Sequence, residues 1–257
     1  MRIAIILGIL IMTVLSAHAE IKTERITYKQ GDTELEGYLA YDTAKQGKLP
    51  GVLVAPDWMG PGKFSDGRAE ELAKMGYVAF VVDIYGKSVR PANQQEAGAA
   101  AGKFKNDRPT VRARMQAALD ILKARDNVDA SKIAAIGYCF GGMCVLELAR
   151  SGAPVAGVVT FHGSLDSPAP QDAKNINAKV LVLHGADDKF VNEQVAGFQD
   201  EMRGGNVDWQ MIYYADSVHS FTNPAAGSDK SKGVAYNEKA DRRSWEAMRT
   251  FFGEIFK

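Results

Sequence analysis

Two kinds of hydrophobic pattern divide the chain after residue 20. Residues 21–29 and 33–40 alternate apolar and polar positions around a Gln-Gly-Asp turn, which predicts an antiparallel β-hairpin. Beyond it, short apolar runs are separated by longer stretches with helical spacing. The short runs predict strands at 51–55, 77–83, 132–136, 155–161, 179–184 and 209–214. The longer stretches predict helices at 65–75, 110–123, 140–151, 192–203 and 236–255.

This alternation predicts the fold class. Strands that are apolar along their whole length are buried on both faces, as in a mostly parallel sheet with helices on both sides. Ligands bind such α/β proteins at the carboxyl ends of the strands. Residues 87–108 do not follow the alternation, because they are rich in alanine, glycine and polar side chains. They fit either a short helix with a loop that lies over those strand ends as a lid, or a solvated connection.

The first residues have the pattern of a secretory signal peptide. Arg2 precedes an apolar stretch at 3–15, and Ala17-His18-Ala19 supplies a small-x-small cleavage pattern. A membrane anchor is the alternative, although the stretch is shorter than the roughly 20 residues that a spanning helix needs. We therefore expect residues 1–19 to be removed and the protein to be secreted, most simply to the periplasm. No proline-rich or low-complexity linker divides residues 20–257, which predicts one domain there.

Composition narrows the classes of partner. The chain has 31 basic and 31 acidic residues and no basic patch, which argues against nucleic acid. No metal-ligand spacing appears among its four histidines and two cysteines, so we expect no metal and no cofactor. The pattern favours a small-molecule substrate, with no membrane contact once the signal is removed, and leaves the oligomeric state open.

One cysteine stands where a predicted strand turns into a helix. Residues 137–142 read Gly-Tyr-Cys-Phe-Gly-Gly, directly after the apolar run at 132–136. Flanking glycines let the backbone turn tightly and present the Cys139 sulfur at the strand end, as in a nucleophile elbow. An ordinary glycine-rich turn holding a small buried cysteine is the alternative. Cys144 lies five residues further on, where its side chain should point elsewhere, so no disulfide is expected.

A cysteine nucleophile needs a base and an acid that orients the base. His219 follows the predicted strand at 209–214, and Asp187 and Asp188 follow the one at 179–184. Nucleophile, acid and histidine then occur in the chain order of an α/β-hydrolase triad. We assign the acid to Asp188 from the Gly-x-x-Asp-x-x-Val spacing of 185–191, with Asp187 as the alternative. His219 as a loop histidine and Asp188 as a helix cap are the structural alternatives.

Two other histidines, His162 and His184, also lie at the ends of predicted strands and precede glycines. Hydrogen bonds to neighbouring loops would explain them, so we do not assign them to the site.

The chain resembles the dienelactone hydrolase family from about residue 33 to its end. The resemblance rests on five motifs: Ala-Pro-Asp-Trp-Met-Gly at 55–60, Val-Asp-Ile-Tyr at 82–85, the elbow at 137–142, His-Gly-Ala-Asp-Asp at 184–188 and His-Ser-Phe at 219–221. The elbow cysteine is the most specific, because most α/β-hydrolases have serine there. The resemblance implies an α/β-hydrolase fold and a Cys-His-Asp hydrolase that acts on esters or lactones.

The resemblance also implies roles for the first loop and for substrate binding. Asp57 takes the place of a carboxylate that helps to deprotonate the thiol, and the amides of Trp58 and Phe140 take the places of the oxyanion-hole donors. The family's dienelactone hydrolases bind a substrate carboxylate with two arginines, where this chain has Lys87 and Asn223. Lysine loses the bidentate fork and asparagine loses the charge, so we expect a substrate other than dienelactone. Arg90, near Lys87, is a further candidate to bind an anionic group of the substrate.

These observations predict a hydrolase that cleaves small carboxylic esters or lactones through a thioacyl-enzyme intermediate. A peptidase or acyltransferase on the same fold is the first alternative, because a triad specifies neither leaving group nor acceptor. A thiol redox or sensor protein that uses Cys139 and Cys144 is the second.

Overall fold

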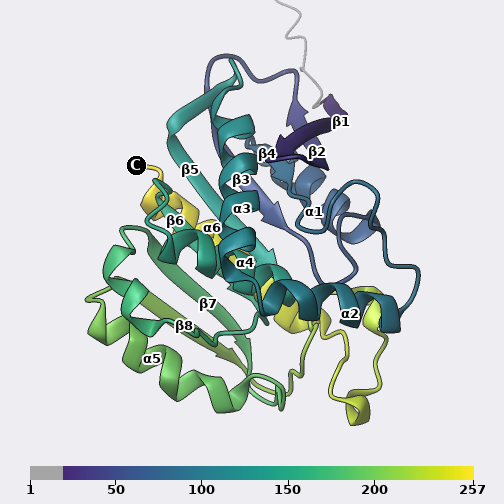
Figure 1. The fold of residues 1–257 in the computed structure, drawn as a ribbon, viewed down its shortest axis with the longest axis vertical. Coiled ribbons are helices and arrows are strands. Elements are labelled where there is room, and N and C mark those ends of the chain that lie inside the picture. Colours follow the sequence, from purple (N-terminus) through teal and green to yellow (C-terminus); the bar gives the residue numbers. More distant parts are fainter. Residues whose placement is uncertain (1–19) are drawn as a thin grey trace, which may run out of the picture.

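The computed structural model describes residues 20–257, which are built around one eight-stranded sheet (Figure 1). The predicted signal peptide lies outside the described residues. The strand order is β1-β2-β4-β3-β5-β6-β7-β8. The strands are β1 (Ile21–Gln30), β2 (Thr33–Asp42), β3 (Leu49–Ala55), β4 (Val78–Val81), β5 (Val128–Tyr138), β6 (Gly157–Phe161), β7 (Lys179–Gly185) and β8 (Trp209–Tyr214).

The predicted hairpin and the predicted parallel sheet are both present. β1 and β2 pair antiparallel, with Ile21 opposite Asp42 and Gln30 opposite Thr33. β2 pairs antiparallel with β4, and every later pairing, from β4–β3 to β7–β8, is parallel. The prediction of a mostly parallel sheet with an antiparallel start is therefore confirmed, and the carboxyl ends of β3 to β8 meet at one edge.

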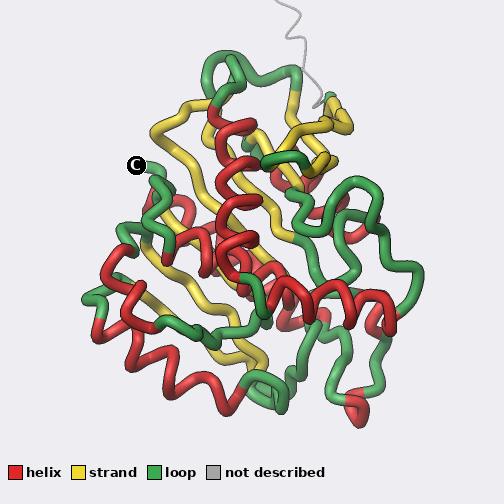
Figure 2. The backbone as a smooth tube through the Cα atoms, in the orientation of Figure 1, coloured by secondary structure: helices red, strands yellow, loops and turns green. Residues whose placement is uncertain are grey.

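Helices cover both faces of the sheet (Figure 2). Alternate residues of β3 divide between two cores: Leu53 packs with the core under α3 and α4, and Val52 with the core under α1 and α6. This is the two-sided burial that the continuous apolar strands predict. Within residues 20–257, no helix combines the length and the hydropathy needed to cross a membrane. The helices are α1 (Lys63–Lys74), α2 (Gln94–Lys105), α3 (Arg108–Lys123), α4 (Phe140–Arg150), α5 (Val195–Gly204) and α6 (Glu238–Ile255).

Residues 87–108, which do not follow the alternation, fit the alternative of a short helix with a loop, because they contain α2. The Asn93 side chain caps it by accepting a hydrogen bond from the Glu96 amide. Its buried face consists of small residues and Phe104, whose ring stacks on Tyr85 at 5.6 Å between centroids. Alanines and glycines at the contact give a weak helical periodicity, and packing against the strand ends orders the helix instead.

Candidate active site

Cys139 lies at the junction of β5 and α4 in a strained backbone conformation. Its φ is 53° and its ψ is −113°, a region that a non-glycine residue enters only at a cost of about 1–3 kcal/mol. Two glycines make the turn possible. A Cβ on Gly137 would strike the Gly141 carbonyl, and a Cβ on Gly141 would strike the Ala55 carbonyl at the end of β3. The strain is the observation that separates this turn from an ordinary strand-to-helix connection.

Hydrogen bonds join Cys139 to His219 and His219 to Asp188. The Cys139 sulfur lies 3.0 Å from His219 Nε2, and His219 Nδ1 lies 2.7 Å from Asp188 Oδ2. Asp188 is fully buried, and its other oxygen accepts a hydrogen bond from the Phe190 amide at 3.0 Å. Asp187 is exposed, and its amide donates to the Ser217 carbonyl. Of the two neighbouring aspartates, Asp188 is the one that bonds to the histidine.

The electrostatics of His219 follow from this arrangement. Burial lowers the pKa of the imidazole, but negative charge on the Cys139 sulfur and on Asp188 outweighs burial and raises the pKa to about 10. The imidazole therefore holds its second proton at neutral pH whenever the sulfur is charged.

The His219 ring lies between two aromatic rings. The His162 ring packs edge-to-face on it at 5.3 Å, and the Phe190 ring does so at 5.8 Å. His162 Nε2 also bonds to Thr222 Oγ1 at 2.8 Å, three residues beyond His219. Burial and the nearby His219 charge hold the pKa of His162 well below its usual range, so a neutral ring faces the charged one. The sequence did not assign His162 to the site, and the structure puts it against His219.

His184, by contrast, lies away from the site. Its Nε2 bonds to Asn192 Oδ1 at 2.7 Å and its ring meets Tyr213, which fits the structural role expected of it. Both histidines precede glycines at strand ends, so the sequence offers no signal that distinguishes them.

The loop after β3 brings Asp57 and Trp58 to the same edge of the sheet. Asp57 is partly buried, and its Oδ1 accepts a hydrogen bond from the Met59 amide at 2.9 Å. Burial raises the pKa of this carboxyl, opposed by the Met59 amide, the Asn223 side chain and the His219 charge. Within residues 20–257 no hydrogen bond joins Asp57 to Cys139.

Tyr85 supports both residues whose amides are the expected oxyanion donors. Its hydroxyl donates to the Trp58 carbonyl at 2.8 Å, and its ring packs on Phe140 at 5.5 Å. Phe140 begins α4, so its amide is among the free donors of a first helical turn. The motif at 82–85 contained this tyrosine, but nothing in the sequence indicated which loops it would join.

The residues expected to bind a substrate carboxylate are separated in space. Lys87 Nζ donates to Thr27 Oγ1 at 3.1 Å and lies 3.9 Å from Glu36, both on the hairpin. Arg90 pairs with the buried Asp83 at 3.1 Å. Asn223 alone of the three lines the pocket beside the site. The structure thus does not bring Lys87 and Asn223 together.

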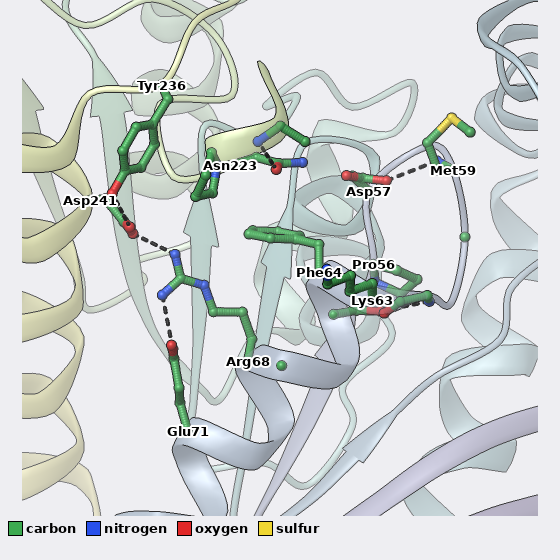
Figure 3. A pocket seen from close by; sticks show the side chains of 16 residues that line it. Pro56, Asp57, Met59, Lys63, Phe64, Arg68, Glu71, Asn223, Tyr236 and Asp241 are labelled. Carbon is green, nitrogen blue, oxygen red and sulfur yellow. Dashed lines mark hydrogen bonds and ion pairs between the residues drawn. The ribbon is translucent and has the colours of Figure 1, made fainter. Parts of the chain in front are cut away.

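That pocket has a volume of about 640 Å³ (Figure 3). It lies between the loop after β3, the first turns of α1 and the loop that follows His219. Asp57 and Asn223 line its side nearest the triad candidates, whereas Cys139 and His219 do not line it. Phe64, another lining residue, packs edge-to-face at 5.0 Å on Tyr138, the residue before Cys139.

In the described residues, neither a disulfide nor a cluster of metal-ligand side chains accompanies the two cysteines. Cys144 is fully buried, and burial raises the pKa of its thiol well above the usual range. Neither cysteine forms a disulfide. In the part of the chain that the structure describes, no cluster of three or more histidine, cysteine or carboxylate side chains is arranged to hold a metal ion.

Comparisons with known proteins identify the family. The model of the dienelactone hydrolase family matches residues 35–256. A solved structure named m3DLH is 41% identical, covers 92% of this chain and 99% of its own, and superposes with a TM-score of 0.88. A dienelactone hydrolase-like promiscuous phosphotriesterase from metagenomic libraries is also 41% identical, covers 93% of this chain and all of its own, and has a TM-score of 0.87.

A curated relative agrees with these structures. A putative carboxymethylenebutenolidase of Salmonella typhimurium is 26% identical over 88% of this chain and 84% of its own length. Together with the sheet topology, these matches establish that the chain belongs to the dienelactone hydrolase family and is an ester or lactone hydrolase with an α/β-hydrolase fold.

Proposed function

We propose that the protein hydrolyses small carboxylic esters or lactones with Cys139 as nucleophile, His219 as general base and acid, and Asp188 as the carboxylate that orients the histidine. The observation that carries the proposal is the continuous hydrogen-bonded series from the Cys139 sulfur through both His219 nitrogens to Asp188. Such a series holds the base within reach of the proton it moves.

The reaction has two halves. The Cys139 thiolate attacks the ester carbonyl carbon, and the negative charge that forms on the carbonyl oxygen is stabilised by the Trp58 and Phe140 amides. The carbon–oxygen bond to the alcohol breaks, and His219 Nε2 gives the departing oxygen its proton, which leaves a thioester on Cys139. His219 then takes a proton from water, which attacks the thioester. The acid departs, and the sulfur is again negatively charged.

Asp57 has a separate role in this proposal. At rest the sulfur carries a proton; when substrate covers the site, the Asp57 carboxylate accepts that proton, and it returns the proton to the Cys139 sulfur after the acid has departed. Its burial and its raised pKa support this role, because a carboxylate that has lost solvation is a better proton acceptor. Asp57 then acts in acylation and has no part in the water attack.

The names of relatives suggest the first substrates to try. One relative is named as a probable lactonase, and the phosphotriesterase cited above is 41% identical to this chain. A panel of short-chain p-nitrophenyl esters, aryl esters, lactones and one phosphotriester therefore spans the reactions that these names describe.

The direct experiment compares turnover of a p-nitrophenyl ester by the wild-type protein, Cys139→Ala and His219→Ala. Both substitutions are expected to reduce kcat by at least about 10³-fold, because the members of a triad act as a unit. Circular dichroism and thermal unfolding verify that both variants fold. Unchanged turnover in both folded variants would overturn the proposal.

The alternatives predict different products. An acyltransferase releases its acyl group to an added alcohol or amine in preference to water, which product analysis measures directly. A redox protein loses both thiols after mild peroxide treatment and has no esterase activity. Full burial of Cys144 and the raised pKa of its thiol argue against that second role.

The segment before the described residues carries a proposal of its own. We propose that residues 1–19 direct export to the periplasm and are removed after Ala19, and that residues 20–257 act as one domain. Intact-mass analysis of the protein from a periplasmic fraction tests this. A mature chain beginning at Glu20 is expected, and an uncut cytoplasmic chain would contradict it.

A further inference from the structure

We infer that the pocket beside the triad takes an uncharged, apolar arm of the ester, and that the preferred substrates are neutral esters. The inference rests on the proposed function and adds the substrate class to it. The volume of about 640 Å³ lies within the roughly 300–1,000 Å³ typical of small-molecule sites. It exceeds what an acetyl group needs, so part of the substrate is expected to fill it.

The pocket adjoins the reacting atoms through two of its walls. Asp57 and Asn223 form the wall nearest His219. Asn223 lies four residues beyond that histidine in the chain, and the His219 charge acts on the Asp57 carboxyl. Phe64 forms a second wall and packs on the residue before the nucleophile. A group attached to a carbonyl held at Cys139 therefore has a short path into this space.

The walls suit an apolar group. Five of the residues that line the pocket have apolar side chains: Pro56, Met59, Phe64, Pro224 and Ala225. Burial of apolar surface stabilises a bound alkyl or aryl group by about 0.8 kcal/mol for each methylene, or about fourfold in affinity.

The charges in the pocket disfavour an anion. Its one buried cation is Arg68, whose guanidinium donates to Glu71 at 2.9 Å, to Asp241 at 2.6 Å and to the Thr222 carbonyl at 2.9 Å. Glu71 and Asp241 neutralise the charge of Arg68, and the three hydrogen bonds take three of its five N–H donors. Lys63 is the other lining cation, and it is exposed to solvent on the rim.

A substrate carboxylate would also face Asp57, a partly buried carboxyl group that lines the pocket. Asn223 presents a neutral amide, whose oxygen already accepts a hydrogen bond from the Ala225 amide. A carboxylate placed beside Asp57 and Asn223 would lose hydration there, which is unfavourable. A pair with the solvent-exposed Lys63 would return little of that cost.

One glycine allows the pocket to be filled without touching the triad. Gly67 lines it from α1, and a Cβ built there meets no atom within 4 Å. A leucine at this helical position is expected to fold, because leucine favours helix more than glycine does. Gly197 in α5 is a matched control, since it is helical, equally open and outside the pocket.

The experiment measures kcat/KM for p-nitrophenyl acetate, p-nitrophenyl hexanoate, the mono-p-nitrophenyl ester of adipic acid and the methyl ester of that monoester. We expect hexanoate to exceed acetate by at least about tenfold. We expect the neutral methyl ester to exceed the anionic monoester by a similar factor. Ethyl acetate and hexyl acetate repeat the comparison with the chain length varied in the alcohol part of the ester, because either the acyl or the alcohol part can be the group that enters the pocket.

Gly67→Leu is expected to reduce the long-to-short ratio at least about fivefold in one of the two series, while Gly197→Leu keeps the wild-type ratios. Equal turnover of the anionic and neutral adipates, or ratios that Gly67→Leu leaves unchanged in both series, would overturn the inference. Failure of the proposed function has a different signature, namely acetate hydrolysis that persists in Cys139→Ala.

Discussion

The two ends of α4 carry buried polar groups arranged in opposite ways. At the amino end, the series Cys139–His219–Asp188 begins at a thiol whose hydrogen-bond partner within residues 20–257 is the histidine alone. At the carboxyl end, Glu147 and Arg150 are fully buried in a network of ion pairs. The same helix therefore holds one group that is free to react and another that is fully paired.

The paired end is a closed arrangement of charges. Glu147 bonds to Arg112 at 2.7 Å, to Arg150 at 3.0 Å and to Arg108 at 3.3 Å, and Arg150 also pairs with Glu201 at 2.7 Å. Each charge is satisfied by several partners, so no group there is available to a substrate. Strained backbone lies at the other end, at Cys139, the nucleophile of the proposed function.

This difference predicts that substitutions at the two ends have separable effects. Changes in the triad are expected to reduce turnover with little loss of stability, and changes in the ion network to reduce stability with little loss of turnover. Four substitutions test that separation, beginning with the largest effect.

Asp188→Asn is expected to reduce kcat by about 10³- to 10⁴-fold, because an amide no longer stabilises the charged, correctly oriented imidazole. Steady-state kinetics with a p-nitrophenyl ester measure the loss, and chemical denaturation measures stability. Asp187→Asn is the matched control, since this neighbour is exposed and is expected to keep wild-type turnover. A larger loss in Asp187→Asn than in Asp188→Asn would reverse the assignment of the acid.

Glu147→Gln is expected to reduce the free energy of unfolding by about 3–5 kcal/mol, because three arginines lose a buried counter-charge. Urea denaturation measures this, and kcat of the folded fraction is expected to stay within about twofold. Glu246→Gln removes an exposed pair with Arg249 and serves as the control, with a loss below about 1 kcal/mol. If the two losses are similar, the buried network does not stabilise the helix.

Asp57→Asn is expected to slow acylation by about 10- to 100-fold and to leave deacylation nearly unchanged. Rapid mixing separates the two phases, and equal slowing of both would remove the thiol-activating role.

Asp57→Asn, which slows acylation, is expected to increase stability at neutral pH. Burial raises the pKa of Asp57 above its ordinary value, so the folded protein binds a proton more tightly than the unfolded chain does. The stability from this site is complete below the ordinary pKa and is lost as pH rises through the folded value. Asp57→Asn removes that loss, so its Tm is expected to exceed the wild-type Tm at pH 7 and to approach it near pH 4.

His162→Gln is expected to have the smallest effect, about a fivefold decrease in kcat with KM unchanged, because His219 loses a packing neighbour. His184→Gln removes a buried histidine away from the site and is expected to keep the wild-type kcat. The pKa of His162 is well below its usual range, so its neutral form contributes stability that is lost as pH falls below the ordinary value. The wild-type protein should therefore lose more stability than His162→Gln between pH 7 and pH 5.

The sequence was sufficient for the elements whose residues carry a local signal. The parallel sheet followed from the continuous apolar runs, because such strands are buried on both faces. The tight turn at Cys139 followed from its flanking glycines, and the hairpin followed from the turn at 30–32. α2 could only be left as one of two alternatives, because its alanines and glycines give no clear period. Its order depends on Tyr85 and Trp58, which come from other loops.

For the candidate site, the sequence was sufficient to propose the three residues of the hydrogen-bonded series but not the contacts between loops. Strand-end positions were enough to propose Cys139, Asp188 and His219, because parallel strands end at one edge. Contacts across loops were not predictable, since no local pattern encodes them. The His162 ring on His219, the Tyr85 bond to Trp58 and the position of Lys87 on the hairpin side are of this kind.

The most direct test of the central claim is detection of an acyl group on Cys139. A slowly deacylating ester, such as p-nitrophenyl trimethylacetate, is mixed with the protein, quenched in acid and analysed by intact-mass and peptide mass spectrometry. The account predicts one acyl group for each chain, on the peptide that contains Cys139, and none in Cys139→Ala. Full ester turnover without an adduct, or an adduct on another residue that turns over at the catalytic rate, would contradict it.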